Sequence, residues 1–337
     1  MIADLPRSET PREPGAQALD VIINPAAGSG RAGRLWPGFA RTLEARGYVV
    51  RAHQTAAPGD ATRLATSLAE HGASTIVCVG GDGTVNEVVN GLIVDDRAVN
   101  PDLKLAIIAC GTGKDLVRSL GTRDLNTTIQ ALAGGVMTLI DVGRVHYIEP
   151  RTGHLEARYF VNVADAGLGA TVAARINASS KRLGGLITYL RAAVSTIAGH
   201  TAWEASIDID GELAYEGRVG MVVFANGRYF AGGMRVAPDA SLCDGMIDVF
   251  ILQDVGKRAL LTSLLPRVYR GRHVGQPGVT HATAGTVSLR STSGMLVELD
   301  GEQVGRAPLS VTMVPRVLRV VGTAALEAMS GCADARP

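Results

Sequence analysis

Three glycine-rich loops, each directly after a short apolar run, constrain the fold of this chain more than any other feature of its sequence. The loops contain Gly28, Gly80 and Gly111, and segments with a helical spacing of apolar residues follow them. Strands that alternate with helices are typical of a doubly wound parallel sheet. Ligands of such sheets bind at the carboxyl ends of the strands, which is where the loops would lie. The first part of the chain therefore predicts an α/β fold with a ligand site built from loops.

The pattern changes after residue 138, where strand-like segments dominate. Asp-Gly and Asn-Gly pairs separate many of them, and such pairs are typical of hairpins in antiparallel sheets. The length of 337 residues leaves room for two cores. We therefore expect an α/β plus mainly β chain with a disordered tail over 1–18, an N-terminal doubly wound parallel α/β domain over 19–138 to which 313–330 returns, and a C-terminal antiparallel β-rich domain over 139–312.

Charge and cysteine content disfavour several classes of protein. The 33 Lys and Arg nearly balance the 32 Asp and Glu, so we expect no nucleic-acid partner. The four cysteines form no CxxC pair, so neither a zinc site nor a disulfide is expected. The N-terminal segment lacks the apolar core of a signal peptide, and no apolar run approaches the roughly 20 residues that span a bilayer. These features predict a cytoplasmic protein, and any contact with the inner membrane face would be peripheral.

The first loop has the spacing G-x-G-x-x-G at Gly28, Gly30 and Gly33, which is typical of dinucleotide-binding folds. Those folds place a carboxylate about 20 residues further on, against the ribose. Here the second strand-like segment ends with His-Gln-Thr at 53–55, so a nicotinamide-dependent dehydrogenase is disfavoured. The loop could still bind phosphate through its main-chain N–H groups.

The second loop is Gly80-Gly81-Asp82-Gly83-Thr84. Its glycines allow the main chain to approach a ligand closely, and the helix that follows directs free N–H groups toward the loop. Asp82 would repel a phosphate unless a cation lay between them, so the loop suits a metal-bound polyphosphate. A tight turn in which Asp82 and Thr84 cap the helix would explain the same residues equally well.

The third loop covers 111–115 and follows the neighbouring strand-like segment. The chain has no GxxxxGK[ST] motif, so it is not a P-loop NTPase. Two glycine-rich loops at the ends of adjacent strands together favour a site for nucleotide phosphates.

Further short motifs continue this series toward the C-terminus. In order, the segments are 24–30 (NPAAGSG), 80–87 (GGDGTVNE), 111–115 (GTGKD), 226–234 (NGRYFAGGM), 237–240 (APDA), 244–245 (DG) and 299–302 (LDGE). The series, which spans about 19–325, resembles the soluble lipid kinases built on the diacylglycerol kinase catalytic domain, including bacterial diacylglycerol kinases and sphingosine kinases. A GGDGT loop alone also occurs in NAD kinases and phosphofructokinases, whereas the ordered series is far more specific.

The resemblance implies transfer of the γ-phosphoryl group of ATP, with Mg²⁺, to a lipid hydroxyl such as that of diacylglycerol at a membrane surface. It also implies a nucleotide-binding first domain of the NAD kinase and phosphofructokinase type, and a second domain that binds the lipid acceptor. The nucleotide-binding residues would be Asn24, Pro25, Gly28, Thr55, Gly80, Gly81, Asp82, Gly83, Thr84, Asn86, Glu87, Thr112 and Lys114. A metal site would form in the turn 241–246 from main-chain oxygens and the Asp244 carboxylate, with Ser241 and Met246 at its ends.

The general base of this family lies in a DGE triplet near the C-terminus, and the chain has two such triplets, at 210–212 and 300–302. The order of the family's motifs favours Asp300 as the base, with Glu302 assisting or replacing it. Either triplet could instead be a hairpin turn with solvated acids. We expect that structural role for Asp210.

Lys114 departs from the family pattern, which usually has Asn at this position. A lysine could add a charge to the phosphates or remove an amide hydrogen bond, so the departure bears on nucleotide affinity and on the choice of phosphate donor. Two other functions therefore stay open: an NAD kinase-like phosphotransferase with a soluble acceptor, and a catalytically silent lipid-binding regulator. Basic residues around an apolar helix could face anionic lipid headgroups or, more simply, solvent; they are Arg175, Lys181, Arg182 and Arg191.

Overall fold

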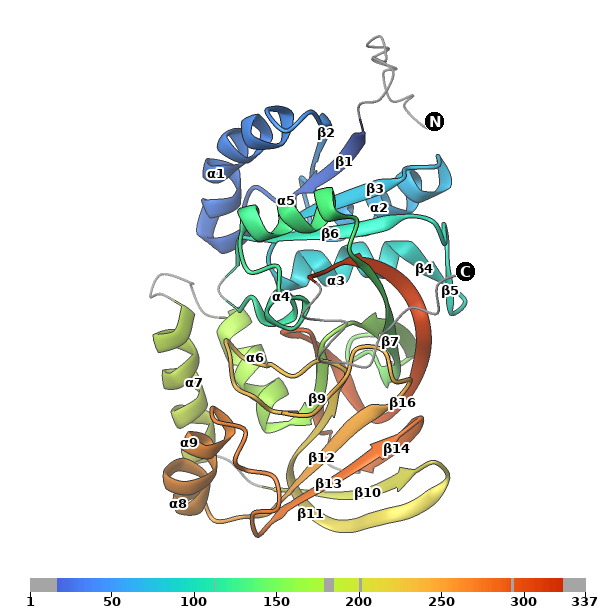
Figure 1. The fold of residues 1–337 in the computed structure, drawn as a ribbon. Helices are drawn as coiled ribbons and strands as arrows, with labels where there is room; N and C mark the ends of the chain where they lie inside the picture. Colours follow the sequence, from blue (N-terminus) through green and yellow to red (C-terminus); the bar gives the residue numbers. More distant parts are fainter. Residues whose placement is uncertain (1–16, 112, 179–184, 200–201, 292–293, 324–337) are drawn as a thin grey trace.

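Strands and helices alternate in the first part of the computed structural model, which describes residues 17–111, 113–178, 185–199, 202–291 and 294–323 (Figure 1). The elements are β1 (Ala18–Ile23), α1 (Ala27–Glu44), β2 (Val49–Gln54), α2 (Asp60–Glu70), β3 (Thr75–Gly80), α3 (Asp82–Leu92), β4 (Ile93–Val94), β5 (Arg97–Ala98), β6 (Lys104–Ala109), α4 (Asp115–Leu120) and α5 (Leu125–Gly134). Strands β6, β3, β1 and β2 lie side by side in that order, and each pair is parallel. The predicted α/β character of this part is confirmed.

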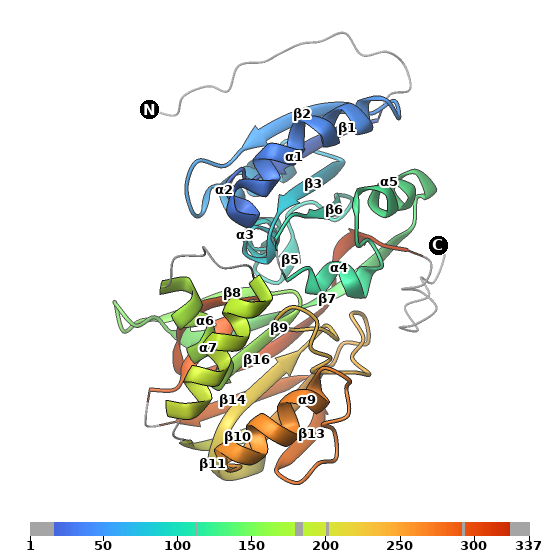
Figure 2. The same cartoon turned by 90° about the vertical axis from the view of Figure 1, so that its left-hand side faces the viewer.

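Consecutive residues of the central strands are buried on opposite faces of this sheet. Val21 of β1 packs in a core with Leu43 of α1 and Ile129 of α5, whereas Ile22 packs in another core with Val88 of α3. Helices therefore cover both faces, as Figure 2 also shows. Because both faces are buried, the strands are nearly continuous apolar runs in the sequence.

Antiparallel strands dominate the second part of the chain. Its elements are β7 (Met137–Ile148), β8 (Leu155–Phe160), β9 (Val163–Gly167), α6 (Leu168–Ala178), α7 (Gly185–Gly199), β10 (Trp203–Ile209), β11 (Glu212–Ala225), β12 (Ile247–Gln253), α8 (Lys257–Ala259), η1 (Leu260–Leu264), α9 (Leu265–Val268), β13 (Val279–Ala284), β14 (Thr286–Ser291), β15 (Leu296–Leu299) and β16 (Glu302–Val321). Strands β13, β12, β11, β10, β14 and β16 pair in that order, all antiparallel. The predicted β-rich character of this part is confirmed.

The long strand β16 connects the two parts. It pairs antiparallel with β14 and β7, and near its end Val320 pairs in parallel with Leu105 of β6. The residue boundaries expected between the two domains, at 138 and 312, therefore lie inside β7 and β16. A single hydrogen-bonded network of strands thus holds the two parts together.

Cysteine pairing corrects one expectation. Cys78 and Cys110 are free, as expected, but Cys243 is disulfide-bonded, so the prediction of no disulfide is wrong. The sequence pattern missed this bond because the cysteines of the chain form no CxxC pair or other recognisable spacing.

Some expectations concern residues outside the described ranges. These are nearly all of the 1–18 tail, Thr112, Lys181, Arg182 and residues 324–330 of the segment expected to return to the first domain. The side chain of Arg191 is also not described. Among the described residues, no helix is long and apolar enough to cross a membrane.

Candidate active site

The three glycine-rich loops lie against one another at the carboxyl ends of β1, β3 and β6. Asn24 Nδ2 of the first loop donates a hydrogen bond to Thr84 Oγ1 of the second over 3.0 Å. A Cβ at Gly28 would lie 2.3 Å from the Cys110 carbonyl oxygen, and one at Gly111 would lie 2.9 Å from Gly81 Cα. Since real Cβ contacts are never this short, only glycine permits these loops to pack so closely. The loops therefore form one continuous main-chain surface.

The second loop leads directly into α3 without a capping side chain. The residue before the helix is Gly81, and no side chain caps the helix start. Thr84 Oγ1 instead accepts the bond from Asn24. The alternative reading, in which Asp82 and Thr84 cap the helix, is therefore not supported, and the N–H groups of the first turn remain directed toward the loops.

Two carboxyl groups in these loops bind protons more tightly than usual. Burial, together with the nearby Asp115 and Asp300 carboxylates, raises the pKa of Asp82 to about 7. Burial also raises the pKa of Asp115 to about 6, although its Oδ2 accepts a hydrogen bond from Gly232 N over 2.7 Å. Groups that titrate near neutral pH in a loop cluster are common at functional sites, where a cation or a proton can balance their charge.

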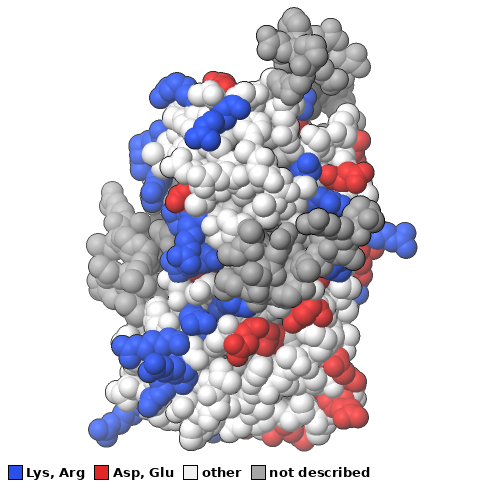
Figure 3. Space-filling view, viewed as in Figure 1, with Lys and Arg blue, Asp and Glu red and all other residues white. Residues whose placement is uncertain are grey.

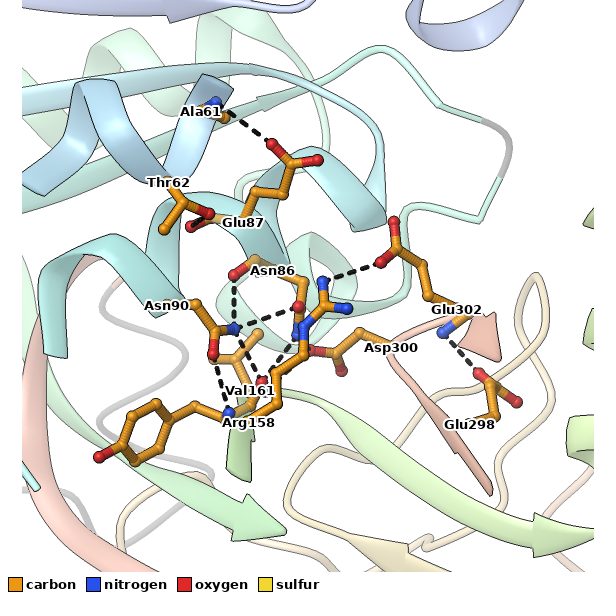
Figure 4. A network of polar contacts seen from close by, with 12 residues as sticks. Ala61, Thr62, Asn86, Glu87, Asn90, Arg158, Val161, Glu298, Asp300 and Glu302 are labelled. Atoms are coloured by element: carbon orange, nitrogen blue, oxygen red, sulfur yellow. Dashed lines mark hydrogen bonds and ion pairs between the residues drawn. The ribbon is translucent and has the colours of Figure 1, made fainter. Parts of the chain in front are cut away.

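Asp300 anchors the DGE turn between β15 and β16 to the second loop's helix (Figure 4). Its Oδ2 accepts hydrogen bonds from Asn86 Nδ2 over 2.8 Å and from Val161 N over 2.9 Å. Its Oδ1 accepts bonds from Asn162 N over 2.9 Å and from Val163 N over 3.1 Å. Burial raises the pKa of Asp300 in spite of these four donors. Since a carboxylate offers about four acceptor positions, this side chain is saturated.

Glu302 differs from Asp300 in exposure and in bonding. Its side chain is 38% exposed, and its Oε2 accepts a bond from Arg158 over 2.8 Å. Its Oε1 lies 2.5 Å from the position that a Cβ of Gly83 would occupy. Glu302 is therefore the carboxylate of the triplet that extends over the second loop (Figure 4).

The second DGE triplet lies elsewhere, in the hairpin between β10 and β11. Asp210 Oδ1 accepts hydrogen bonds from Gly285 N over 3.1 Å and from Thr286 N over 2.8 Å. These bonds hold the hairpin against the start of β14, in agreement with the structural role expected for Asp210.

The other expected nucleotide-binding residues divide into two groups. Thr55 N bonds to Ile23 O over 2.9 Å and Pro25 O accepts a bond from Gly33 N over 3.3 Å, so both residues lie beside the first loop. The Glu87 carboxylate is directed elsewhere, because its Oε2 accepts a bond from Ala61 N over 3.2 Å at the start of α2.

The expected metal-binding turn contributes one carboxylate. Asp244 Oδ1 accepts a bond from Met246 N over 3.0 Å, and Asp141 Oδ2 accepts one from Gly245 N over 2.7 Å. Within the described ranges, no three His, Cys, Asp or Glu side chains are grouped so that they could hold a metal ion. A metal at this turn would thus depend mainly on main-chain oxygens, and the site at Ser241, Asp244 and Met246 stays a prediction.

Sequence patterns missed two residues of the site. Asp115 bonds to Gly232, which joins the third loop to the glycine-rich turn of the 226–234 motif. Arg158 of β8 holds Glu302. An arginine within an alternating strand gives no motif, so the pairing becomes visible only when the two strands are placed in space.

An apolar cavity of about 120 Å³ lies in the β-rich part. Its lining comes from α6, α7, η1 and α9, from β11, β12 and β13, and from the connecting segments 226–236 and 269–278; the lining residues are Leu168, Gly169, Val172, Ala193, Ile197, Met221, Val223, Phe230, Met234, Val236, Phe250, Leu252, Leu260, Leu264, Leu265, Val268, His273 and Val279. Such a cavity suits an aliphatic chain.

Known proteins resemble both parts of the chain. The model of the diacylglycerol kinase catalytic domain matches residues 18–145, and that of the YegS C-terminal NAD kinase beta sandwich-like domain matches residues 162–322. The diacylglycerol kinase of Bacillus subtilis is 29% identical over 307 residues, covering 89% of this chain and 95% of that relative. The diacylglycerol kinase of Staphylococcus saprophyticus is 29% identical over 289 residues, covering 86% of this chain and 90% of that relative.

Solved structures share the fold. A Bacillus anthracis diacylglycerol kinase has a TM-score of 0.66 at 21% identity, covering 94% of this chain and all of that one. Yeast NADH kinase, solved with NADH, has a TM-score of 0.51 at 11% identity, covering 96% of this chain and 90% of that one. With its two consecutive domain matches and relatives along nearly its whole length, the chain belongs to the diacylglycerol kinase catalytic-domain family and is a kinase-type phosphotransferase.

Proposed function

We propose that this protein transfers the γ-phosphoryl group of ATP to the hydroxyl group of a lipid such as diacylglycerol, with Mg²⁺. One observation carries the proposal: the DGE turn of the β-rich part reaches the phosphate-type loop of the α/β part, through the Asn86–Asp300 hydrogen bond and the approach of Glu302 to Gly83. Acids that accept a proton and N–H groups that bind phosphates are thereby adjacent. Phosphoryl transfer depends mainly on such positioning.

The loop surface would bind the triphosphate. Its glycines at 28, 81 and 83 place no side chain over the main chain, and the start of α3, which has no side-chain cap, directs free N–H groups toward the same place. Lys114, at the start of α4, would add a positive charge. Asn24 would act by holding the first two loops together.

The DGE turn would supply the base for the lipid hydroxyl. In the described conformation, all four acceptor positions of Asp300 are occupied by fixed donors. Glu302, with a single bond to Arg158 and partial exposure, retains acceptor capacity over Gly83. We therefore assign proton acceptance to Glu302 and the positioning of the turn to Asp300, which reverses the order of preference drawn from the family motif.

Mg²⁺ would neutralise phosphate charge when bound. The chemistry of the loops is compatible with a cation, because burial, with the Asp115 and Asp300 carboxylates, raises the pKa of Asp82, and a cation would balance its negative charge. Asp82, which lies in the loop itself, would contribute a ligand to this cation, and the turn with Ser241, Asp244 and Met246 would hold a second cation.

The acceptor's apolar chain would occupy the cavity in the β-rich part. Figure 3 shows Lys and Arg gathered along the edge of the molecule that α1, α4, α8 and α9 occupy in Figure 1. Basic residues of these helices include Arg41, Arg118, Lys257, Arg258 and Arg267. This edge would favour contact with an anionic lipid surface.

A transfer assay with labelled ATP tests the proposal. Diacylglycerol, monoacylglycerol, a sphingoid base and NAD⁺ would be supplied as acceptors, each with and without Mg²⁺. Label in an organic-extractable product supports the lipid kinase. Label in NADP⁺ would instead support a soluble-acceptor kinase, which the fold likeness to yeast NADH kinase makes the second candidate. No transfer to any acceptor would contradict both and favour the silent regulator.

A further inference from the structure

One polar side chain lies in the wall of the apolar cavity. Among the described residues that line it, His273 is the one whose side chain carries a nitrogen or oxygen atom. Only 6% of this residue is exposed, and its ring lies 5.5 Å from the ring of Phe250, measured between centroids. A buried imidazole in an otherwise aliphatic and aromatic cavity is unusual, because each of its nitrogens needs a hydrogen-bond partner.

The two ring nitrogens of His273 are in different situations. Nε2 lies 2.9 Å from the Val236 carbonyl oxygen, and a carbonyl can only accept, so Nε2 carries the proton. Burial lowers the pKa of His273, and the nearby His281 lowers it further, so the ring is neutral at pH 7. Nδ1 is therefore an acceptor, yet it is buried and has no hydrogen-bond partner anywhere in the described part of the chain.

A water molecule would satisfy this acceptor poorly. Buried waters are held by two to four polar partners, whereas among the described lining residues Nδ1 is the one side-chain nitrogen or oxygen without a partner. An apolar chain would fill the cavity better than water does, provided that the chain carries a hydrogen-bond donor within reach of Nδ1. The chemistry that fits the whole cavity is thus an aliphatic chain with one hydroxyl group.

We propose that His273 is a specificity-determining residue whose Nδ1 accepts a hydrogen bond from a hydroxyl group on the apolar chain of the bound ligand. The ligand's identity as the phosphoryl acceptor rests on the proposed function, but its binding to the cavity does not. The consequence is a preference for hydroxylated over plain aliphatic chains.

Isothermal titration with two isomers tests the proposal without ATP. Octanol and heptyl methyl ether have the same atoms, but only octanol donates a hydrogen bond. We expect the protein to bind octanol about tenfold more tightly, since one added neutral hydrogen bond has roughly this effect. His273→Phe should bind both equally, while His281→Phe, which alters a histidine outside the cavity lining, should keep the preference. Equal binding by the unmodified protein, failure to bind either isomer, or a preference that survives in His273→Phe would overturn the proposal.

A spectroscopic measurement covers the case in which His273→Phe does not fold. The ¹⁵N chemical shift of Nδ1 in the unmodified protein should move on addition of octanol and stay in place with the ether. A shift that responds to neither compound would contradict the hydrogen bond.

Transfer assays separate this proposal from the kinase function. Dioleoylglycerol and diricinoleoylglycerol differ by a hydroxyl on each chain, and we expect the hydroxylated lipid to have the higher kcat/KM. If octanol is preferred but no lipid is phosphorylated, the kinase proposal fails and the His273 site stands. If both lipids are phosphorylated equally and octanol is not preferred, the His273 proposal fails and the kinase stands.

Discussion

Asn86 Nδ2 donates a hydrogen bond to Asp300 Oδ2 over 2.8 Å, joining two residues that are 214 positions apart in the chain. Asn86 lies in the helix of the GGDGT loop, and Asp300 begins the DGE triplet before β16. Both groups are buried, with 0% and 8% exposure. The glycine-rich GGDGT loop and the acidic DGE triplet are thus fixed relative to each other by a short, buried hydrogen bond.

The first prediction separates the two carboxylates of the triplet. Glu302→Gln should lower kcat by roughly 10²- to 10⁴-fold, the usual contribution of a positioned base, with little change in unfolding temperature or ATP affinity. Asp300→Asn should lower activity and also stability by about 1–3 kcal/mol, because its new amide would face N–H donors. Steady-state kinetics, calorimetric ATP binding and thermal unfolding provide the three measurements.

Asp210→Asn is the matched control for both variants, because it changes the other DGE triplet and should leave turnover nearly unchanged. Should Asp300→Asn lose turnover at full stability while Glu302→Gln stays active, Asp300 is the base after all. If Asp210→Asn is the variant that loses turnover, the choice of triplet is wrong.

The sequence predicted those parts of the fold that local patterns encode. Apolar runs that end in glycine loops predicted β1, β3 and β6, since strands buried on both faces need such runs. β16 was not recognised as one strand, because Gly305, Pro308 and Pro315 interrupt its pattern and are typical of turns. The structure accommodates this segment through register shifts against β7 between Arg306 and Ser310 and between Val314 and Leu318.

For the site too, the sequence predicted only what local patterns encode. Glycine spacing identified the three loops, because close main-chain packing has a compositional signature. The partners of the DGE triplet could not be predicted, since Asn86, Arg158 and the N–H groups near Val161 come from three distant segments. The pairing of β9 with β15 brings the N–H groups near Val161 to Asp300, whereas Asn86 and Arg158 reach the triplet from α3 and β8.

The second prediction concerns the proposed phosphate loop. Gly83→Val should weaken ATP binding at least tenfold, or about 1.4 kcal/mol, because a side chain would obstruct the approach of phosphates to the main chain. The same side chain would also displace Glu302, whose Oε1 lies 2.5 Å from the Cβ position. Calorimetric titration with ATP measures the effect.

A double variant distinguishes these two causes. In a Glu302→Ala background, Gly83→Val should still weaken ATP binding tenfold if the loop itself contacts the nucleotide. Gly38→Val is the control, because no atom lies within 4 Å of a Cβ at this position in α1. Unchanged affinity in folded Gly83→Val would remove the loop from the nucleotide site.

The third prediction is a pH dependence of stability that originates at a buried acid pair. Asp165 of β9 pairs in register with Glu298 of β15, and both are buried. Burial raises the pKa of Asp165 to about 6, and burial with the neighbouring Asp165 raises the pKa of Glu298 well above its usual value. The folded state therefore holds more protons than the unfolded state above pH 4. Stability should fall as the pH rises through about 6.

Asp165→Asn should flatten this dependence, because a neutral amide has no proton to lose. Urea unfolding at each pH measures the effect. Between pH 4 and pH 7, the free energy of unfolding of Asp165→Asn should fall by a few kcal/mol less than that of the unmodified protein. Asp60→Asn is the control, because Asp60 contributes a pH dependence of stability with the opposite sign. The N–H groups of Ala56 and Ala57 lower the pKa of Asp60, so its contribution is lost on acidification. A slope that is unchanged in Asp165→Asn would exclude the pair as its origin.

The fourth prediction concerns the departure at Lys114. This residue adopts a left-handed conformation, with φ 56° and ψ 31°, directly before α4. Lysine is strained there, whereas asparagine and glycine tolerate this region. Lys114→Asn and Lys114→Gly should therefore raise the free energy of unfolding by up to about 1 kcal/mol, and Lys114→Ala should not. Urea unfolding of the three variants measures the conformational effect by itself.

Activity measurements on the same variants isolate the effect of the Lys114 charge on the KM for ATP. If the Lys114 ammonium contacts the phosphates, all three variants should raise the KM for ATP by a similar factor, because each lacks the charge whatever its backbone preference. A higher KM in Lys114→Ala alone would point to loop conformation instead.

The silent regulator makes a different prediction: no turnover of the unmodified protein with any lipid. If Lys114→Asn then created activity, the lysine would be the feature that silences the site, and the kinase proposal for the natural chain would be wrong.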